Sequence, residues 1–174
     1  GLYFAASGFQ GYQIILKTDD TFDLYRVTSL SAPPSGCSDV TSDSTWGTWS
    51  IGAKTFLANY VVPANGLVFV EDNLWVEGQI NTARATIAAA RFPDTVATRK
   101  NITINNDLKY TNYDGGDVVA LISQNNVNVG LFSDDNLQID AALIAQNGRI
   151  GRYYYDPPTN GAGTNGNLHA KINK

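Results

Sequence analysis

The feature that most constrains the fold is a short apolar segment, led by an asparagine, that recurs from Gly66 onward. Apolar and variable residues alternate after each asparagine, which is typical of β-strands. Segments this short cannot bury their apolar side chains alone, so we expect them to stack on one another. The copies are Asn73-Leu74-Trp75-Val76, Asn101-Ile102-Thr103-Ile104, Asn126-Val127-Asn128-Val129 and Asn136-Leu137-Gln138-Ile139, with a fainter one at Asn167-Leu168-His169-Ala170.

Stacking of these segments predicts an all-β chain with a β-solenoid or β-helix-like fold. The longer segments 121–125 and 143–147, LISQN and LIAQN, also align with one another. An antiparallel sandwich, in which asparagine only marks strand starts, fits the same pattern and stays open at this point. In the solenoid the alternating aliphatic residues point inward and asparagine or glycine forms the bends. The inward set is Leu74, Val76, Ile102, Ile104, Val127, Val129, Leu137 and Ile139.

The amino-terminal part lacks the asparagine-led segments, and we therefore expect two units, residues 1–65 and residues 66–174. Residues 12–17 and 22–30 alternate and are joined by Thr18-Asp19-Asp20, which predicts a β-hairpin covering one side of the stack. Residues 31–44 are expected to form a loop, before Trp46 and Trp49 return the chain to apolar structure. The alanine-rich segment 83–91 also suits a helix, but we favour a strand.

Charge and composition exclude several classes of function. Twelve basic and sixteen acidic residues give a net charge of −4, which disfavours a broad nucleic-acid surface and leaves Arg99 with Lys100 as the one local basic patch considered. No apolar run approaches the ~18 residues of a membrane helix. The chain starts at Gly1 and contains 0 Met, so we expect a mature or excised piece of a longer product.

The residues available for catalysis are few. His169 and Cys37 are the single histidine and cysteine, so a catalytic triad or a nitrogen and sulfur metal site is not expected, and Cys37 has no internal disulfide partner. The acidic turns Asp114-Gly115-Gly116-Asp117 and Asp134-Asp135 lack the spacing of a loop that encircles Ca²⁺. We therefore expect no enzyme, no cofactor and no metal, while a glycosidase pair of carboxylates stays open.

Aromatic side chains are the remaining candidates for ligand contact. Trp75 lies between Leu74 and Val76 and should project to the opposite face from them. Stacking on sugars or nucleobases is one use of such side chains, and packing against the amino-terminal strands is the other. Together with the basic pair, the candidate contact residues are Trp75, Tyr110, Tyr113, Tyr153, Tyr154, Tyr155, Arg99 and Lys100.

The chain resembles an uncharacterised bacterial β-solenoid family whose members are commonly attached to type IV pilin-like amino-terminal segments. The resemblance spans about residues 66–151, and its most specific element is residues 139–148. The hydrophobic pilin helix is absent from this chain. The segments that carry the resemblance are 66–70 (GLVFV), 73–78 (NLWVEG), 85–89 (ATIAA), 110–114 (YTNYD), 120–125 (ALISQN) and 139–148 (IDAALIAQNG).

The resemblance implies a non-enzymatic, extracellular structural or adhesive domain, the exported head of a minor pilin on a bacterial surface. Its partners would be other pilus subunits or a surface ligand such as a glycan, a protein or DNA. Two alternatives stay open, namely a carbohydrate-binding or carbohydrate-active solenoid and a DNA-capture domain of an uptake pilus.

Overall fold

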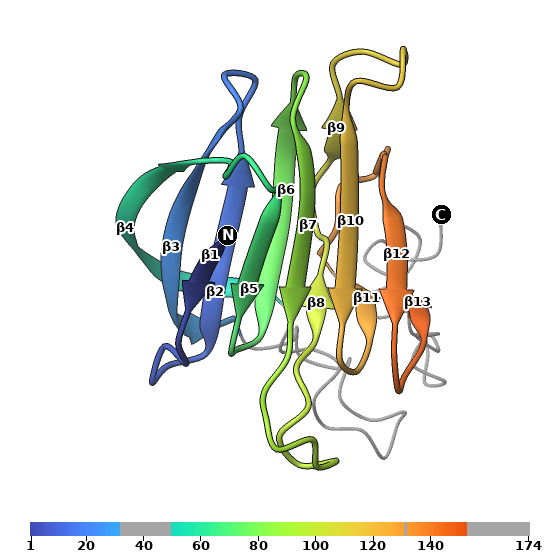
Figure 1. Cartoon of the computed structure of the whole chain (residues 1–174). Helices are drawn as coiled ribbons and strands as arrows, with labels where there is room; N and C mark the ends of the chain where they lie inside the picture. The colour runs from blue at the N-terminus through green and yellow to red at the C-terminus, as the bar shows by residue number, and fades with distance from the viewer. Residues whose placement is uncertain (32–49, 131, 153–174) are drawn as a thin grey trace, which may run out of the picture.

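The computed structural model describes residues 1–31, 50–130 and 132–152 of the 174-residue chain. These residues are all-β, with thirteen strands in two sheets and no helix, as the sequence predicts (Figure 1). Among them there is accordingly no helix of a length and hydropathy that would span a membrane. The predictions that lie outside the described residues concern Cys37, Trp46, Trp49, Tyr153, Tyr154, Tyr155, the predicted loop beyond Ser31 and the segment that holds His169.

One sheet has five strands, and every neighbouring pair in it is parallel. Its strands occupy the front of the view in Figure 1. In spatial order they are β1 (Leu2–Phe4), β5 (Leu67–Val70), β7 (Arg84–Ala89), β10 (Val118–Ser123) and β12 (Ala142–Ala145).

The other sheet has eight strands and combines a parallel part with an antiparallel edge. The strand β9 (Leu108–Tyr110) pairs with the far end of one strand in the parallel part. The remaining strands, in spatial order, are β13 (Ile150–Arg152), β11 (Val127–Val129), β8 (Ile102–Thr103), β6 (Leu74–Ile80), β2 (Gly11–Leu16), β3 (Thr21–Leu30) and β4 (Ile51–Val61).

The chain passes repeatedly from the five-stranded sheet to the eight-stranded sheet. The passages β1 to β2, β5 to β6, β7 to β8, β10 to β11 and β12 to β13 each add one strand to both sheets, beside a strand of the preceding passage. The predicted equivalences are confirmed in register: Leu74 pairs with Ile102, and Ile102 with Val127. Residues 121–123 likewise pair with residues 143–145, as the LISQN and LIAQN alignment predicts.

The predicted amino-terminal hairpin is present. Strands β2 and β3 are antiparallel, with Gly11 opposite Val27 and Leu16 opposite Phe22, and β4 continues the meander. Aromatic rings from these strands and β1 meet at this end of the core, where Tyr60 lies 5.6 Å from Phe22 and 5.2 Å from Phe4 between ring centroids. Strands β1 and β2 join the same two sheets as the strands after Gly66, so β1, β2 and β3 share one core with them.

The core lies between the two sheets and is built from the alternate residues of each strand. Five of the predicted inward residues, Leu74, Val76, Ile102, Ile104 and Val127, are buried there, and Ile139 packs against them. Val129 and Leu137 are only partly buried and are not among the residues of the core cluster. Segment 83–91 contains the strand β7 (Arg84–Ala89), so the prediction of a strand here is confirmed.

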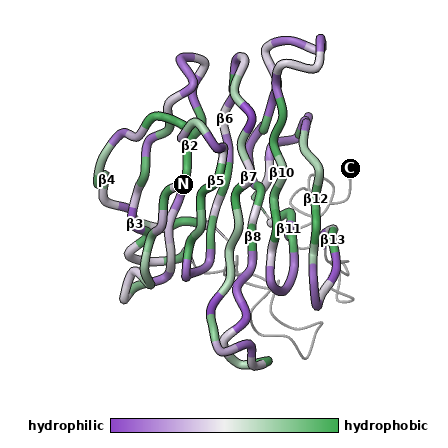
Figure 2. Tube along the Cα trace, viewed as in Figure 1, coloured by the Kyte–Doolittle hydropathy of each residue, from purple (hydrophilic) through white to green (hydrophobic). Residues whose placement is uncertain are grey.

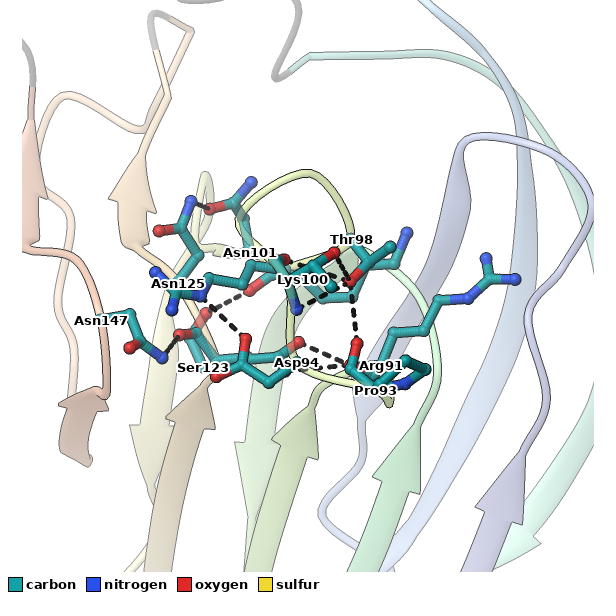
Figure 3. A network of polar contacts seen from close by, with 12 residues as sticks. Arg91, Pro93, Asp94, Thr98, Lys100, Asn101, Ser123, Asn125 and Asn147 are labelled. Carbon is teal, nitrogen blue, oxygen red and sulfur yellow. Dashed lines mark hydrogen bonds and ion pairs between the residues drawn. The ribbon is translucent and has the colours of Figure 1, made fainter.

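Asparagine side chains connect successive passages where strands of the eight-stranded sheet begin. The Asn73 Oδ1 accepts a hydrogen bond from the N–H of Asn101 (3.0 Å). The Asn101 Oδ1 accepts one from the N–H of Asn126 (3.1 Å), whose own Oδ1 accepts one from Arg149 (2.9 Å). Figure 3 shows this corner, where Asn125 also donates to Asn101 (3.0 Å). The recurrent asparagines therefore satisfy backbone N–H groups at the bends, which side chains or water must do at such positions.

Candidate interaction surface

Trp75 points away from the core, as predicted, because its neighbours Leu74 and Val76 point into it. It is not an open contact residue, since only 5% of it is exposed. The side of Trp75 that faces outward from the eight-stranded sheet is therefore shielded from solvent. Trp75 lies in the wall of a pocket on this side, together with Ile51 and Phe132.

Tyr110 and Tyr113 lie close together, with ring centroids 6.2 Å apart. Tyr110 packs against the core, and its hydroxyl accepts a hydrogen bond from the N–H of Val119 (3.0 Å). Tyr113 is exposed and donates to the Asp140 carboxylate (2.7 Å), which also accepts from the Gln138 amide (2.9 Å). Only Tyr113 of this pair is therefore free to meet a partner.

The charged groups around Tyr113 are paired with hydrogen-bond donors or with an opposite charge. Hydrogen bonding to Asp140 raises the pKa of Tyr113. Partial burial would raise the pKa of Asp140, but hydrogen bonds from Tyr113, the Tyr110 N–H and Gln138 lower it on balance. Nearby, the ion pair of Lys109 with Asp107 raises the pKa of the lysine and lowers that of the carboxyl. All four pKa shifts favour the protonation state that each group ordinarily has at neutral pH.

Arg99 and Lys100 do not form a free basic patch. The Arg99 guanidinium is 2.9 Å from the Asp94 carboxylate, and the Lys100 ammonium is 3.4 Å from Asp72. Asp72 is buried and also accepts two hydrogen bonds from Ser7. These carboxylates neutralise both cations, and Lys100 in particular ties together neighbouring passages of the chain.

The aspartates of the turn 114–117 accept hydrogen bonds from backbone N–H groups. Asp114 accepts a hydrogen bond from the Gly116 N–H (2.8 Å), while Asp117 accepts from Asn112 (2.7 Å) and Thr82. Backbone hydrogen bonds, the one from Asn112 first, lower the pKa of Asp117. Across the described ranges, no group of three or more histidine, cysteine or acidic residues is arranged to hold a metal ion.

Two rows of uncharged residues cross the outer face of the five-stranded sheet. One row crosses all five strands through residues paired in register, and a second row crosses four of them. Neither row contains a charge. We call these nine residues the apolar face: Tyr3, Phe69, Ala88, Ile122 and Ile144 in the first row, and Leu67, Thr86, Ala120 and Ala142 in the second.

Solvent reaches much of the apolar face. Tyr3 is 60% exposed, Leu67 50% and Ile144 46%. The stacked rings of Tyr3 and Phe69 are extended by Phe92, which follows β7 and lies 6.5 Å from Phe69 between centroids. Figure 2 shows hydrophobic residues along β5, β10 and β12 and hydrophilic ones at the turns. Contiguous exposed apolar patches rimmed by polar residues are typical of interaction sites.

The apolar face has only a weak signal in the sequence. The alternate positions in β7 and β10 are small or aliphatic on both sides of the strand, for example Thr86 and Ala88 beside Ala85 and Ile87. Strands that are apolar on both sides are typical of parallel sheets covered on both faces. That pattern predicts a covering partner.

No protein-family model, no curated protein and no solved structure matches the chain.

Proposed function

We propose that the chain is a β-solenoid domain that acts as a non-enzymatic scaffold on a bacterial cell surface, as the exported head of a pilin-like protein. In this role the apolar face packs against a neighbouring subunit of the same assembly. The domain supplies shape and a docking surface rather than covalent chemistry.

The solenoid assignment is supported by the order of the strands. Successive passages add neighbouring parallel strands to both sheets, and residues at equivalent places, such as Leu121 and Leu143, pair in register. Each added passage buries apolar side chains against the one before, so rigidity comes from nearest-neighbour stacking.

The observation that carries the assembly role is the exposed apolar face on the outer side of a wholly parallel sheet. All-parallel sheets are normally covered on both faces. The inner face of this sheet is covered by the core, whereas Leu67 and Ile144 on the outer face are about half exposed. A subunit that packs there removes this apolar surface from water at about 25 cal/mol per Å².

A photo-crosslinking experiment in cells that make the full-length product tests this role. p-Benzoylphenylalanine replaces Phe69 on the apolar face or, as the matched control, Phe56, which is an exposed phenylalanine on β4 of the other sheet. We expect the Phe69 position to give a crosslinked product with another subunit of the surface assembly, and the Phe56 position to give much less.

The proposal is wrong if irradiation gives no adduct from Phe69 while the protein is folded and at the cell surface. It is equally wrong if both positions crosslink to the same extent, because the contact would then have no preference for the apolar face. Surface exposure is checked separately by protease treatment of intact cells.

A further inference from the structure

A pocket of about 480 Å³ lies on the outer face of the eight-stranded sheet, on the side of the molecule opposite the apolar face. Gln13, Trp75 and Thr103 form one row across β2, β6 and β8 in its wall. They point away from the core because Ile14 and Ile102, their chain neighbours, lie in it. Its volume is within the range of about 300–1,000 Å³ found for small-ligand sites.

Several polar groups in this pocket have hydrogen-bonding capacity to spare. The Lys54 ammonium donates to the Gln13 Oε1 (2.6 Å), and the Asn106 amide donates to the Glu77 Oε2. Within the described part of the chain, no partner is found for the Gln13 Nε2, the Glu77 Oε1 or the Thr103 Oγ1. None of these three atoms is fully enclosed either, so each can meet a ligand atom.

The charge of the pocket limits the ligand class. Glu77 and Lys54 line the same pocket without forming an ion pair with each other, and their charges cancel. A single lysine, already bonded to Gln13, is a poor match for a phosphate or a polyanion. Free donors beside free acceptors suit hydroxyl groups, which both donate and accept.

Apolar contact comes from Phe132 in the same wall, which is 45% exposed, whereas Trp75 is largely covered. A flat aromatic side chain among amide, carboxylate and hydroxyl groups fits a sugar ring, whose C–H groups pack on the aromatic surface while its hydroxyls bond the polar groups. We propose that this pocket binds the terminal uncharged hexose of a glycan. The site is distinct from the apolar face, so one sheet serves assembly and the other recognition.

The test is a titration of the ¹⁵N-labelled protein with methyl glycosides of glucose, galactose, mannose and N-acetylglucosamine, followed by NMR. Concentrations reach about 20 mM, because a single sugar held by a few hydrogen bonds binds in the millimolar range. We expect at least one glycoside to give saturable shifts at the Glu77 and Thr103 amides. The free hexoses are titrated in parallel, since a glycan terminus is held without its anomeric hydroxyl.

Two near-isosteric variants locate the binding. Thr103→Val removes the free hydroxyl and should weaken binding about tenfold. Thr86→Val makes the same change on the apolar face and should leave the affinity unchanged. Glu77→Gln, which removes the acceptor charge and should also weaken binding, serves if Thr103→Val does not fold. Phe69→Lys should bind the glycoside normally, which separates this test from that of the assembly role.

Three results would overturn the proposal. The first is the absence of saturable shifts with every glycoside. The second is unchanged affinity in a folded Thr103→Val or Glu77→Gln protein, which would place the site elsewhere. The third is binding of a free hexose without binding of its methyl glycoside, which is incompatible with a glycan terminus.

Discussion

The stacked asparagines make a quantitative prediction through Asn101. Its Oδ1 accepts hydrogen bonds from the Asn126 N–H (3.1 Å) and from the Asn125 amide (3.0 Å), so it connects consecutive passages of the chain. Asn101→Ala removes both bonds and leaves a partly buried backbone N–H without its acceptor. Leaving one such group unsatisfied costs about 1–3 kcal/mol of the unfolding free energy.

Two further variants separate the cause. Asn101→Asp keeps an oxygen at the same place and should retain most of the stability at neutral pH. Asn136→Ala removes an exposed asparagine that starts a similar sequence segment but has no hydrogen bond to a neighbouring passage among the described residues. It should change stability by less than about 0.5 kcal/mol.

Urea unfolding followed by circular dichroism measures the three variants, and an unchanged m-value shows that the two end states are comparable. For a domain of this size the Asn101→Ala protein should also melt about 2–10 °C lower. The reasoning is refuted if Asn101→Ala is as mild as Asn136→Ala. It is also refuted if Asn101→Asp is as damaging as Asn101→Ala.

Two other predictions concern backbone strain at a glycine and the loss of stability at low pH. Gly78 and Gly115 both have positive φ, but a Cβ at Gly78 would lie 2.1 Å from the Leu16 carbonyl oxygen, whereas one at Gly115 meets nothing within 4 Å. Gly78→Ala should therefore lower the unfolding free energy by about 2 kcal/mol or more beyond Gly115→Ala, and equal losses in urea unfolding would contradict this. Backbone N–H donors lower the pKa of Asp117 in the folded state, so its stabilisation is present above the ordinary carboxyl pKa of about 4 and is lost as the pH falls through the folded value. Asp117→Asn should accordingly lose less stability than the wild type between pH 7 and about pH 3, and an identical loss would refute that role.

The sequence predicted strands and register well where the pattern was local. The alternation of apolar and polar residues predicted the β2–β3 hairpin. The similar sequences of residues 121–125 and 143–147 predicted two strands that do pair in register. Asn73, Asn101 and Asn126 likewise hold equivalent places. In each case the pattern reflects contacts between adjacent passages, which repeat in the sequence as they do in space.

Prediction failed where a residue's surroundings come from distant segments. Leu137 follows an asparagine, as Leu74, Ile102 and Val127 do. In this segment, however, the hydrogen bond to the preceding passage comes from the Gln138 N–H, which donates to Asp107 (2.8 Å). Lys100 suggested part of a basic patch because Asp72, which neutralises it, is far away in the sequence.

The two candidate surfaces show the same limit. Each strand contributes one or two residues to the apolar face, and no short window of sequence reveals that Tyr3, Phe69 and Ile144 lie in one row. The pocket on the other sheet combines Gln13 with Thr103, two residues brought together only by the pairing of β6 with both β2 and β8.

The central claim is that successive passages lie directly on one another, and cysteine crosslinking across the apolar face tests it most directly. In a Cys37→Ser background, Thr86→Cys with Ala120→Cys places the two thiols on paired strands, where the Cα atoms are about 4.8 Å apart and within disulfide range. Thr86→Cys with Ala142→Cys skips one strand and separates the Cα atoms by about 10 Å, beyond that range. The stack predicts rapid disulfide formation under mild oxidation in the first pair and none in the second. A disulfide in the second pair, or none in the first while the protein stays folded, would contradict the account.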